Sequence, residues 1–126
     1  MGSLLFVVPG RPVSKGRPRF FRGKAITPAA TRKHEAFVAT CARAEMGRTG
    51  YAMATGPVSL EITAYFDSHR RVDLDNVAKL VGDALNAVAW RDDSQVYELH
   101  VYRDFDKQAP RTAVEIRPWA PAKVAE

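Results

Sequence analysis

The alternation of hydrophobic and polar residues along the chain predicts four strands and two helices. Residues 58–67 alternate at every second position, which is typical of a strand that buries one face. Apolar residues recur at spacings of three and four over residues 75–88, and a weaker stripe of the same kind covers residues 28–46, so both segments are expected to be helices. Three further segments are expected to form the remaining strands, at residues 4–8, 96–105 and 112–117.

The order of these elements favours an α+β fold in a single domain that spans residues 1–126. The short connection between the last two strands indicates an antiparallel pair, whereas a crossover through the second helix would make another pair parallel. We therefore expect a mixed four-stranded sheet with helices packed on it. Residues 11–24 contain repeated Pro and Gly and are expected to form a loop or an irregular hairpin. The tail from about Pro118 is expected to fray.

The composition excludes several classes of protein. No apolar run approaches the roughly 20 residues that span a bilayer. The single cysteine, Cys41, rules out an internal disulfide, and together with three scattered histidines it gives no spacing suited to zinc. Because there is neither a disulfide framework nor an export signal, the expected location is the cytoplasm, and no membrane partner is expected.

Basic residues are concentrated in one segment. The net charge is +5, from 19 Lys and Arg against 14 Asp and Glu, and residues 10–34 contain no acid at all. Such a segment attracts polyanions, nucleic acid first; the alternative is a solvated surface without a partner. The basic residues of the segment are Arg11, Lys15, Arg17, Arg19, Arg22, Lys24, Arg32 and Lys33.

Acidic residues gather around the second predicted helix. Asp73 and Asp75 are two residues apart, so in an extended lead-in their side chains project the same way. The exposed N–H groups and the positive dipole end of a helix start stabilise carboxylates there. Lys79 follows Asp75 by four residues and Asp83 repeats the step, so these side chains are expected to lie along one face of the helix.

Two more acids, Asp92 and Asp93, lie on the turn that follows this helix. Several carboxylates that meet at one point repel each other unless a cation lies between them, and hard oxygen ligands suit Mg²⁺ or Mn²⁺. These ions activate water and neutralise charge on a phosphodiester under attack, and a nearby lysine can contact the phosphate. An acidic cluster beside a basic surface therefore indicates phosphodiester hydrolysis.

Each acid also has a purely structural interpretation. Asp75 alone could be an ordinary N-cap with Lys79 as its i,i+4 partner, and Asp92 and Asp93 could be turn residues. Two better-defined motifs are excluded. In an EF-hand counted from Asp73, Ala would occupy both positions that require Gly and Glu. A Walker A loop is absent because no glycine of the basic segment begins the required spacing.

Three segments of the chain carry motifs that are specific in combination. They are Gly10–Arg19, Asp73–Lys79 followed by Asp83–Asn86, and Asp92–Val96. The central pair, Asp-x-Asp-Asn-x-x-Lys and Asp-Asp-x-Gln-Val, is separated by one helix. Taken together the segments resemble the RusA family of Holliday junction resolvases, and the resemblance extends from about residue 6 to residue 117.

The resemblance implies a homodimer that binds four-way DNA junctions and cuts symmetrically placed phosphodiesters with Mg²⁺ or Mn²⁺. Carried onto this sequence, it implies that Asp73, Asp75 and Asp93 bind the metal and that Lys79 is catalytic. Of the two neighbouring acids on the turn, Asp93 rather than Asp92 is expected to face the metal. A two-fold dimer supplies two equivalent sites at a fixed separation, which two symmetrical cuts require. The residues expected to hold the DNA backbone are Lys15, Arg17, Arg19, Arg70 and Arg71.

The leading hypothesis is therefore a structure-specific DNA endonuclease of recombination and repair, similar to phage and prophage enzymes. Its rival is a non-catalytic nucleic-acid-binding module, whose acids only cap a helix and form a turn. A third hypothesis, an enzyme that acts on small nucleotides, is disfavoured because the chain has no phosphate-cradling loop. Dependence of DNA nicking on a divalent metal distinguishes the first two.

Overall fold

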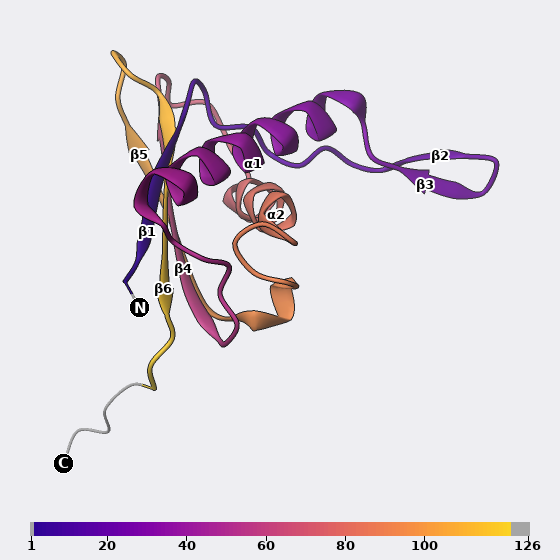
Figure 1. Ribbon diagram of the computed structural model, residues 1–126. Helices are drawn as coiled ribbons and strands as arrows, with labels where there is room; N and C mark the ends of the chain where they lie inside the picture. Colours follow the sequence, from indigo (N-terminus) through magenta and orange to yellow (C-terminus); the bar gives the residue numbers. More distant parts are fainter. Residues whose placement is uncertain (1, 122–126) are drawn as a thin grey trace.

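A computed structural model describes residues 2–121 and contains two helices packed on one face of a four-stranded sheet (Figure 1). The strands of the sheet are β1 (Leu4–Pro9), β4 (Val58–Phe66), β5 (Val96–Phe105) and β6 (Arg111–Pro118). Their order is β1-β6-β4-β5; β4 and β5 are parallel, and the other neighbours are antiparallel. The expected mixed sheet and the α+β class are confirmed, and the parallel pair is the one joined through the second helix.

The helices are α1 (Ala29–Thr49) and α2 (Leu74–Leu85). α1 continues past the predicted end near residue 46 and stops where Gly50 adopts a left-handed conformation with φ of 77°. α2 is shorter than predicted, because the chain turns back after Asn86, whose side chain accepts a hydrogen bond from the buried Trp90 indole at 2.8 Å. Neither of these helices is long and apolar enough to cross a membrane.

The core lies between the helices and the sheet. Every second residue of β4 faces the helices and is buried, as the alternation predicted, and each large aliphatic side chain buried in this way contributes about 1.5–3 kcal/mol. These residues are Val58, Leu60, Ile62, Ala64 and Phe66. Within residues 2–121 no helix covers the opposite face of the sheet, so Leu5 and Val7 of β1 remain 58% and 46% exposed.

The first two residues of the predicted tail make defined contacts with the sheet. Pro118 belongs to β6, and the next residue, Trp119, donates its backbone N–H to the Pro57 carbonyl at 3.0 Å. Its ring also packs against Tyr97, with 5.1 Å between ring centroids. The predicted fraying therefore does not apply to these two residues, and residues 122–126 lie outside the described part of the chain.

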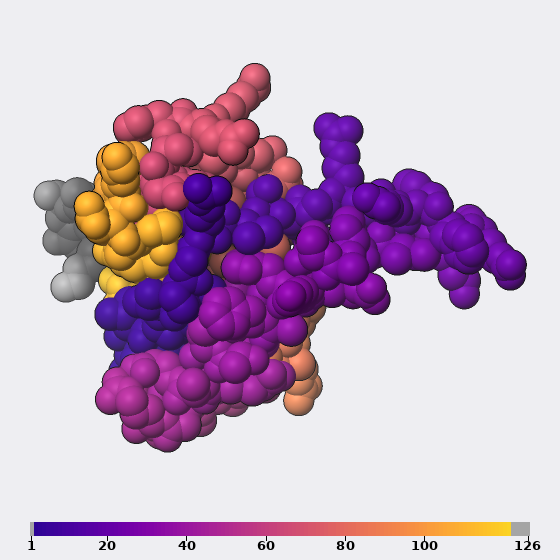
Figure 2. Space-filling model, turned by 90° about the horizontal axis from the view of Figure 1, so that it is seen from above, coloured from indigo at the N-terminus to yellow at the C-terminus, as the bar shows by residue number. Residues whose placement is uncertain are grey.

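The proline- and glycine-rich basic segment forms a hairpin that extends away from the body of the protein (Figures 1 and 2). Its strands are β2 (Arg19–Phe21) and β3 (Lys24–Ile26). Arg22 and Gly23 connect them with φ angles of 52° and 76°, the positive values that a two-residue hairpin turn requires. Of the two expected conformations for this segment, the structure shows the hairpin. Residues 17–26 are called the arm below.

Candidate active site

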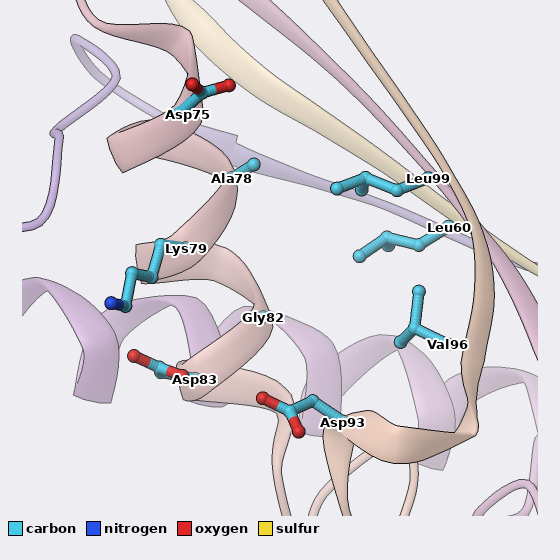
Figure 3. Close-up of a pocket in the computed structure, with 9 residues that line it drawn as sticks. All are labelled: Leu60, Asp75, Ala78, Lys79, Gly82, Asp83, Asp93, Val96 and Leu99. Carbon is cyan, nitrogen blue, oxygen red and sulfur yellow. The ribbon is translucent and has the colours of Figure 1, made fainter.

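A pocket of about 360 Å³ lies between α2 and the start of β5 (Figure 3). One side is polar and the facing side, formed by the strands, is apolar. The strand side is lined by Leu60, Val96 and Leu99. The polar side is lined by Asp75, Lys79 and Asp83 of α2 and by Asp93, the first residue of the short 3-10 helix η1 (Asp93–Gln95).

The polar residues are spread along the pocket. Asp75 and Asp83 are eight residues apart on α2, which corresponds to about 12 Å along the helix axis. Figure 3 shows Asp93 close to the Asp83 end of the helix and far from Asp75, with Lys79 between the two ends. Asp75 therefore lies at one end of the pocket, Asp83 and Asp93 lie at the other end, and the Lys79 ammonium group lies between them.

Asp73 caps α2. Its carboxylate accepts hydrogen bonds from the backbone N–H groups of Asp75 and Asn76 at 3.1 and 3.4 Å and from the Asn76 side-chain amide at 3.0 Å. The structural role proposed for Asp75 thus belongs to Asp73, while Asp75 lies in the first turn. Asp73, Asp75 and Arg71 also line a second hollow that adjoins the first at Asp75.

The expected convergence of Asp73, Asp75 and Asp93 is not seen. Within residues 2–121, no three His, Cys, Asp or Glu side chains lie close enough together to hold a metal ion. Asp73 is satisfied by the start of α2, and Asp93 lies near its other end. The donor chemistry nevertheless fits a hard cation, because Mg²⁺ is usually bound through one or two carboxylates and keeps several waters. The acids at either end of the pocket can meet that requirement without a third.

The turn before β5 separates the roles of Asp92 and Asp93. Asp92 caps η1 by accepting a hydrogen bond from the Ser94 backbone N–H at 3.1 Å, and hydrogen bonding from Ser94 lowers the pKa of this carboxyl group. Asp93 has no such role and lines the pocket. Asp93 rather than Asp92 therefore lines the pocket, and its role as a metal ligand stays a prediction.

Gln95 holds this turn in place. Its side-chain oxygen accepts a hydrogen bond from the Arg91 backbone N–H at 2.9 Å, and its amide donates to the carbonyls of Ala54 and Gly56, both at 3.0 Å. Gln95 thereby ties the turn that carries Asp93 to the segment before β4. Sequence reasoning gave Gln95 no such role; the available signal was a Gln three residues after a capping Asp.

Replacing Gln95 with Glu is expected to lower the free energy of unfolding by about 1–2 kcal/mol, because the carbonyls of Ala54 and Gly56 lose their donor and face a carboxylate. Urea unfolding measures the change. Gln108→Glu is the matched control: Gln108 is exposed, so the same chemical change there is expected to cost less than about 0.5 kcal/mol. Equal unfolding curves for the two variants would contradict the proposed role of Gln95.

Lys15 lies beside the pocket rather than in solvent. Its ammonium group forms ion pairs with Asp83 and, at 3.4 Å, with Glu35 of α1, and its side chain is only 19% exposed. The hydrogen bond with Asp83 raises the pKa of Lys15, and partial burial opposes this as a smaller effect. This position of Lys15 does not agree with its predicted contact with a DNA phosphate. The four other predicted DNA-binding residues are exposed: Arg17, Arg19, Arg70 and Arg71.

Among the polar residues of the pocket, Asp83 is the one to which the sequence analysis assigned no role. The repeated step of four residues from Lys79 was the signal that placed it on the same face of α2. Its ion pair with Lys15 links the base of the arm to the pocket.

Arg103 positions the loop that leads into α2. Its guanidinium donates to the carbonyls of Ser68 and Arg70 at 3.1 and 2.6 Å and lies 4.9 Å from the centroid of the Phe66 ring. These contacts fix the loop that carries Arg70 and Arg71, and Arg71 lines the hollow at the start of α2.

An acidic pocket with a lysine, beside a strongly basic arm, is typical of enzymes that act on nucleic acid. The chain belongs to the family of the endodeoxyribonuclease RusA, whose model matches residues 9–117. It is 33% identical to "Uncharacterized protein YqaN" of Bacillus subtilis (strain 168), over 93% of this chain and 97% of that protein. It is 31% identical to "Crossover junction endodeoxyribonuclease RusA" of Escherichia coli (strain K12), over 82% of this chain and 84% of that protein. The resemblance inferred from the motifs is confirmed.

Proposed function

We propose that this protein is a Holliday junction resolvase, which cuts four-way DNA junctions by Mg²⁺- or Mn²⁺-dependent hydrolysis in DNA recombination and repair. The observation that carries the proposal is the pocket between α2 and β5, where carboxylates and a lysine face an apolar wall. The name of the Escherichia coli relative, a crossover junction endodeoxyribonuclease, supports the choice of substrate.

Asp73 and Asp75 would supply oxygen ligands at one end of α2, and Asp93 would supply one near the other end. A divalent cation bound at either end would supply charge neutralisation at the scissile phosphate and activation of the attacking water. Lys79 lies between the two ends and would contact a phosphate oxygen; among residues 2–121 it forms no ion pair, so its ammonium group is available. The apolar wall strengthens these interactions by lowering the local dielectric.

The exposed arginines on either side of the site would hold the DNA. Arg17 and Arg19 extend along the arm, and Arg70 and Arg71 lie on the loop before α2. Phosphate contacts of this kind position the duplex and carry no sequence information. They support binding to a DNA shape rather than to a base sequence.

A homodimer is part of the proposal, because two symmetrical cuts need two equivalent sites. The uncovered face of the sheet exposes Leu5, Val7 and Tyr102, which offers a second copy an apolar surface. Light scattering on the purified protein is expected to give about 28 kDa, twice the 14.0 kDa of the chain.

The proposal is tested with a synthetic four-way junction and a linear duplex of matched sequence, each incubated with Mg²⁺ or with a chelator. Paired nicks in two opposing strands are expected only on the junction and only with Mg²⁺. Tight binding of the junction without nicking at any Mg²⁺ or Mn²⁺ concentration would favour the non-catalytic binding module instead. Equal cutting of the linear duplex would contradict specificity for junctions.

A further inference from the structure

The arm carries two exposed aromatic side chains among basic ones. Phe20 is 78% exposed and Phe21 is 61% exposed. Cross-strand pairing places Phe20 opposite Ala25 and Phe21 opposite Lys24, and successive residues of a strand face opposite sides, so each face of the arm has one phenylalanine. The Arg22 guanidinium lies 5.4 Å from the centroid of the Phe21 ring. Phe20 differs from Phe21 because its cross-strand neighbour, Ala25, is small, and its ring is the more exposed of the two.

The base of the arm is held close to the pocket. The Lys15 backbone N–H donates to the Asn76 carbonyl at 2.8 Å, and Asn76 is the residue after Asp75. The Gly16 N–H donates to the Thr31 hydroxyl at 3.1 Å, and a Cβ on Gly16 would come within 2.9 Å of that oxygen. The arm therefore starts from a packed base beside the candidate site and extends into solvent (Figure 2).

The arm has the features of a contact surface. Each of its strands has three residues, all exposed, and a two-stranded hairpin alone is marginally stable in water. Contact with a partner would cover the Phe20 ring and restrict the hairpin.

The charge of the arm selects the class of partner. The arm bears Arg17, Arg19, Arg22 and Lys24 and no acid. A second copy would bring an arm of the same positive charge, whereas DNA brings phosphates that neutralise it. Proteins that insert apolar side chains between base steps must unstack them at a cost of a few kcal/mol per step. That cost is lower where the stack is already interrupted, as at the branch point of a junction.

We propose that the arm enters the branch point of the DNA and that Phe20 stacks on a base there, while the arm's basic residues contact the flanking phosphates. The inference rests on the proposed function, since a junction supplies bases whose stack is interrupted on one side. It assigns Phe20 a part in recognising the branch point in addition to the phosphate contacts, because aromatic stacking requires an accessible base face.

The test uses the full-length protein with a chelator, so that the DNA stays intact, and a junction with the fluorescent base 2-aminopurine at the branch point. Wild-type protein is expected to increase the 2-aminopurine emission on binding, because insertion of Phe20 unstacks the base from its neighbour. Phe20→Leu is expected to weaken junction binding about tenfold and to lose the increase. Phe20→Tyr, which keeps an aromatic ring, is expected to retain both.

Phe37→Leu is the matched control, because Phe37 is a 40% exposed phenylalanine on α1, outside the arm. Wild-type affinity and emission in Phe20→Leu would overturn the inference, and so would a change in the solution mass of Phe20→Leu, which would place the arm on a second copy. The same readouts on a duplex with two unpaired bases separate this inference from the proposed function. If the protein shows no preference for junctions, an effect of Phe20→Leu on the bulged duplex still supports stacking, and no effect overturns it.

Discussion

Replacing Asp75 with Asn is expected to reduce junction cleavage at least about a hundredfold while leaving junction binding within about twofold of the wild type. A neutral amide is a poor ligand for a hard cation, and metal-ion catalysis supplies several kcal/mol, of which each 1.36 kcal/mol is a factor of about ten in rate. The basic residues of the arm are untouched, so affinity for DNA is retained. Single-turnover cleavage and gel-shift titration on one preparation measure the two effects.

The stability of this variant identifies the kind of role that Asp75 has. Asp73 is the N-cap of α2 and Asp75 lies in the first turn, so the substitution removes a favourable interaction with the helix dipole and a repulsion between neighbouring carboxylates. These effects oppose each other, and the free energy of unfolding without metal should change by less than about 1 kcal/mol. Large destabilisation together with lost binding would instead mark Asp75 as structural. Cleavage at the wild-type rate would reject its assignment to the site.

The neighbouring acids provide a matched comparison. Asp93→Asn is expected to lose cleavage as Asp75→Asn does, because Asp93 lines the pocket. Asp92→Asn is expected to retain most of it, because Asp92 caps η1 and Asn is also a good N-cap. Titration with Mn²⁺ should show weaker binding of the metal to Asp93→Asn and unchanged binding to Asp92→Asn. The reverse pattern would move the assignment to Asp92.

Replacing Lys15 with Met is expected to lower the free energy of unfolding by about 2–3 kcal/mol. The change leaves Asp83 and Glu35 partly buried and without the cation between them, and uncompensated charges in such positions are costly. Asp83→Asn in the same chain should recover part of the loss, because residues in contact show non-additive effects. Urea unfolding of both single variants and of the double variant measures the coupling.

Arg17→Met is the control for this prediction. Arg17 is exposed on the arm, so its loss should leave stability within about 0.5 kcal/mol while reducing the slope of log K against log salt by about one unit. Lys15→Met should do the opposite, with lost stability and an unchanged salt slope. A reduced slope with unchanged stability in Lys15→Met would instead return Lys15 to its predicted role as a phosphate contact.

The Lys15 ion pairs also have a defined pH dependence. The pKa of Lys15 in the folded protein is raised above its ordinary value of 10.5. The contribution to stability is therefore fully present below pH 10.5 and is lost as the pH rises through the raised pKa. The difference in stability between the wild type and Lys15→Met should be constant from about pH 7 to about pH 10 and should narrow above that range.

The fold class and the shared helix face of Asp75 and Lys79 could be predicted from the sequence because both depend on local patterns. The alternation of apolar and polar residues in β4 and the spacing of apolar residues in α2 show which face of each element is buried. These patterns can be read from the sequence without knowing what each element packs against. The spacing of Asp75 and Lys79 likewise places them on one face of a helix without any knowledge of the sheet. The three motif segments taken together predicted the family.

Only the tertiary structure decided which charged residues pair and which remain available. Lys15 looked like its basic neighbours, but its partner Asp83 is 68 residues away. Gln95 forms its hydrogen bonds to carbonyls about 40 residues earlier, and this contact sets where Asp93 lies. The sequence offered Asp75 as a cap of α2, but the structure gives that role to Asp73, because the helix begins at Leu74. Side chains distant in sequence meet only through the packing of α1 and α2 on the sheet, so their roles are a property of the folded chain.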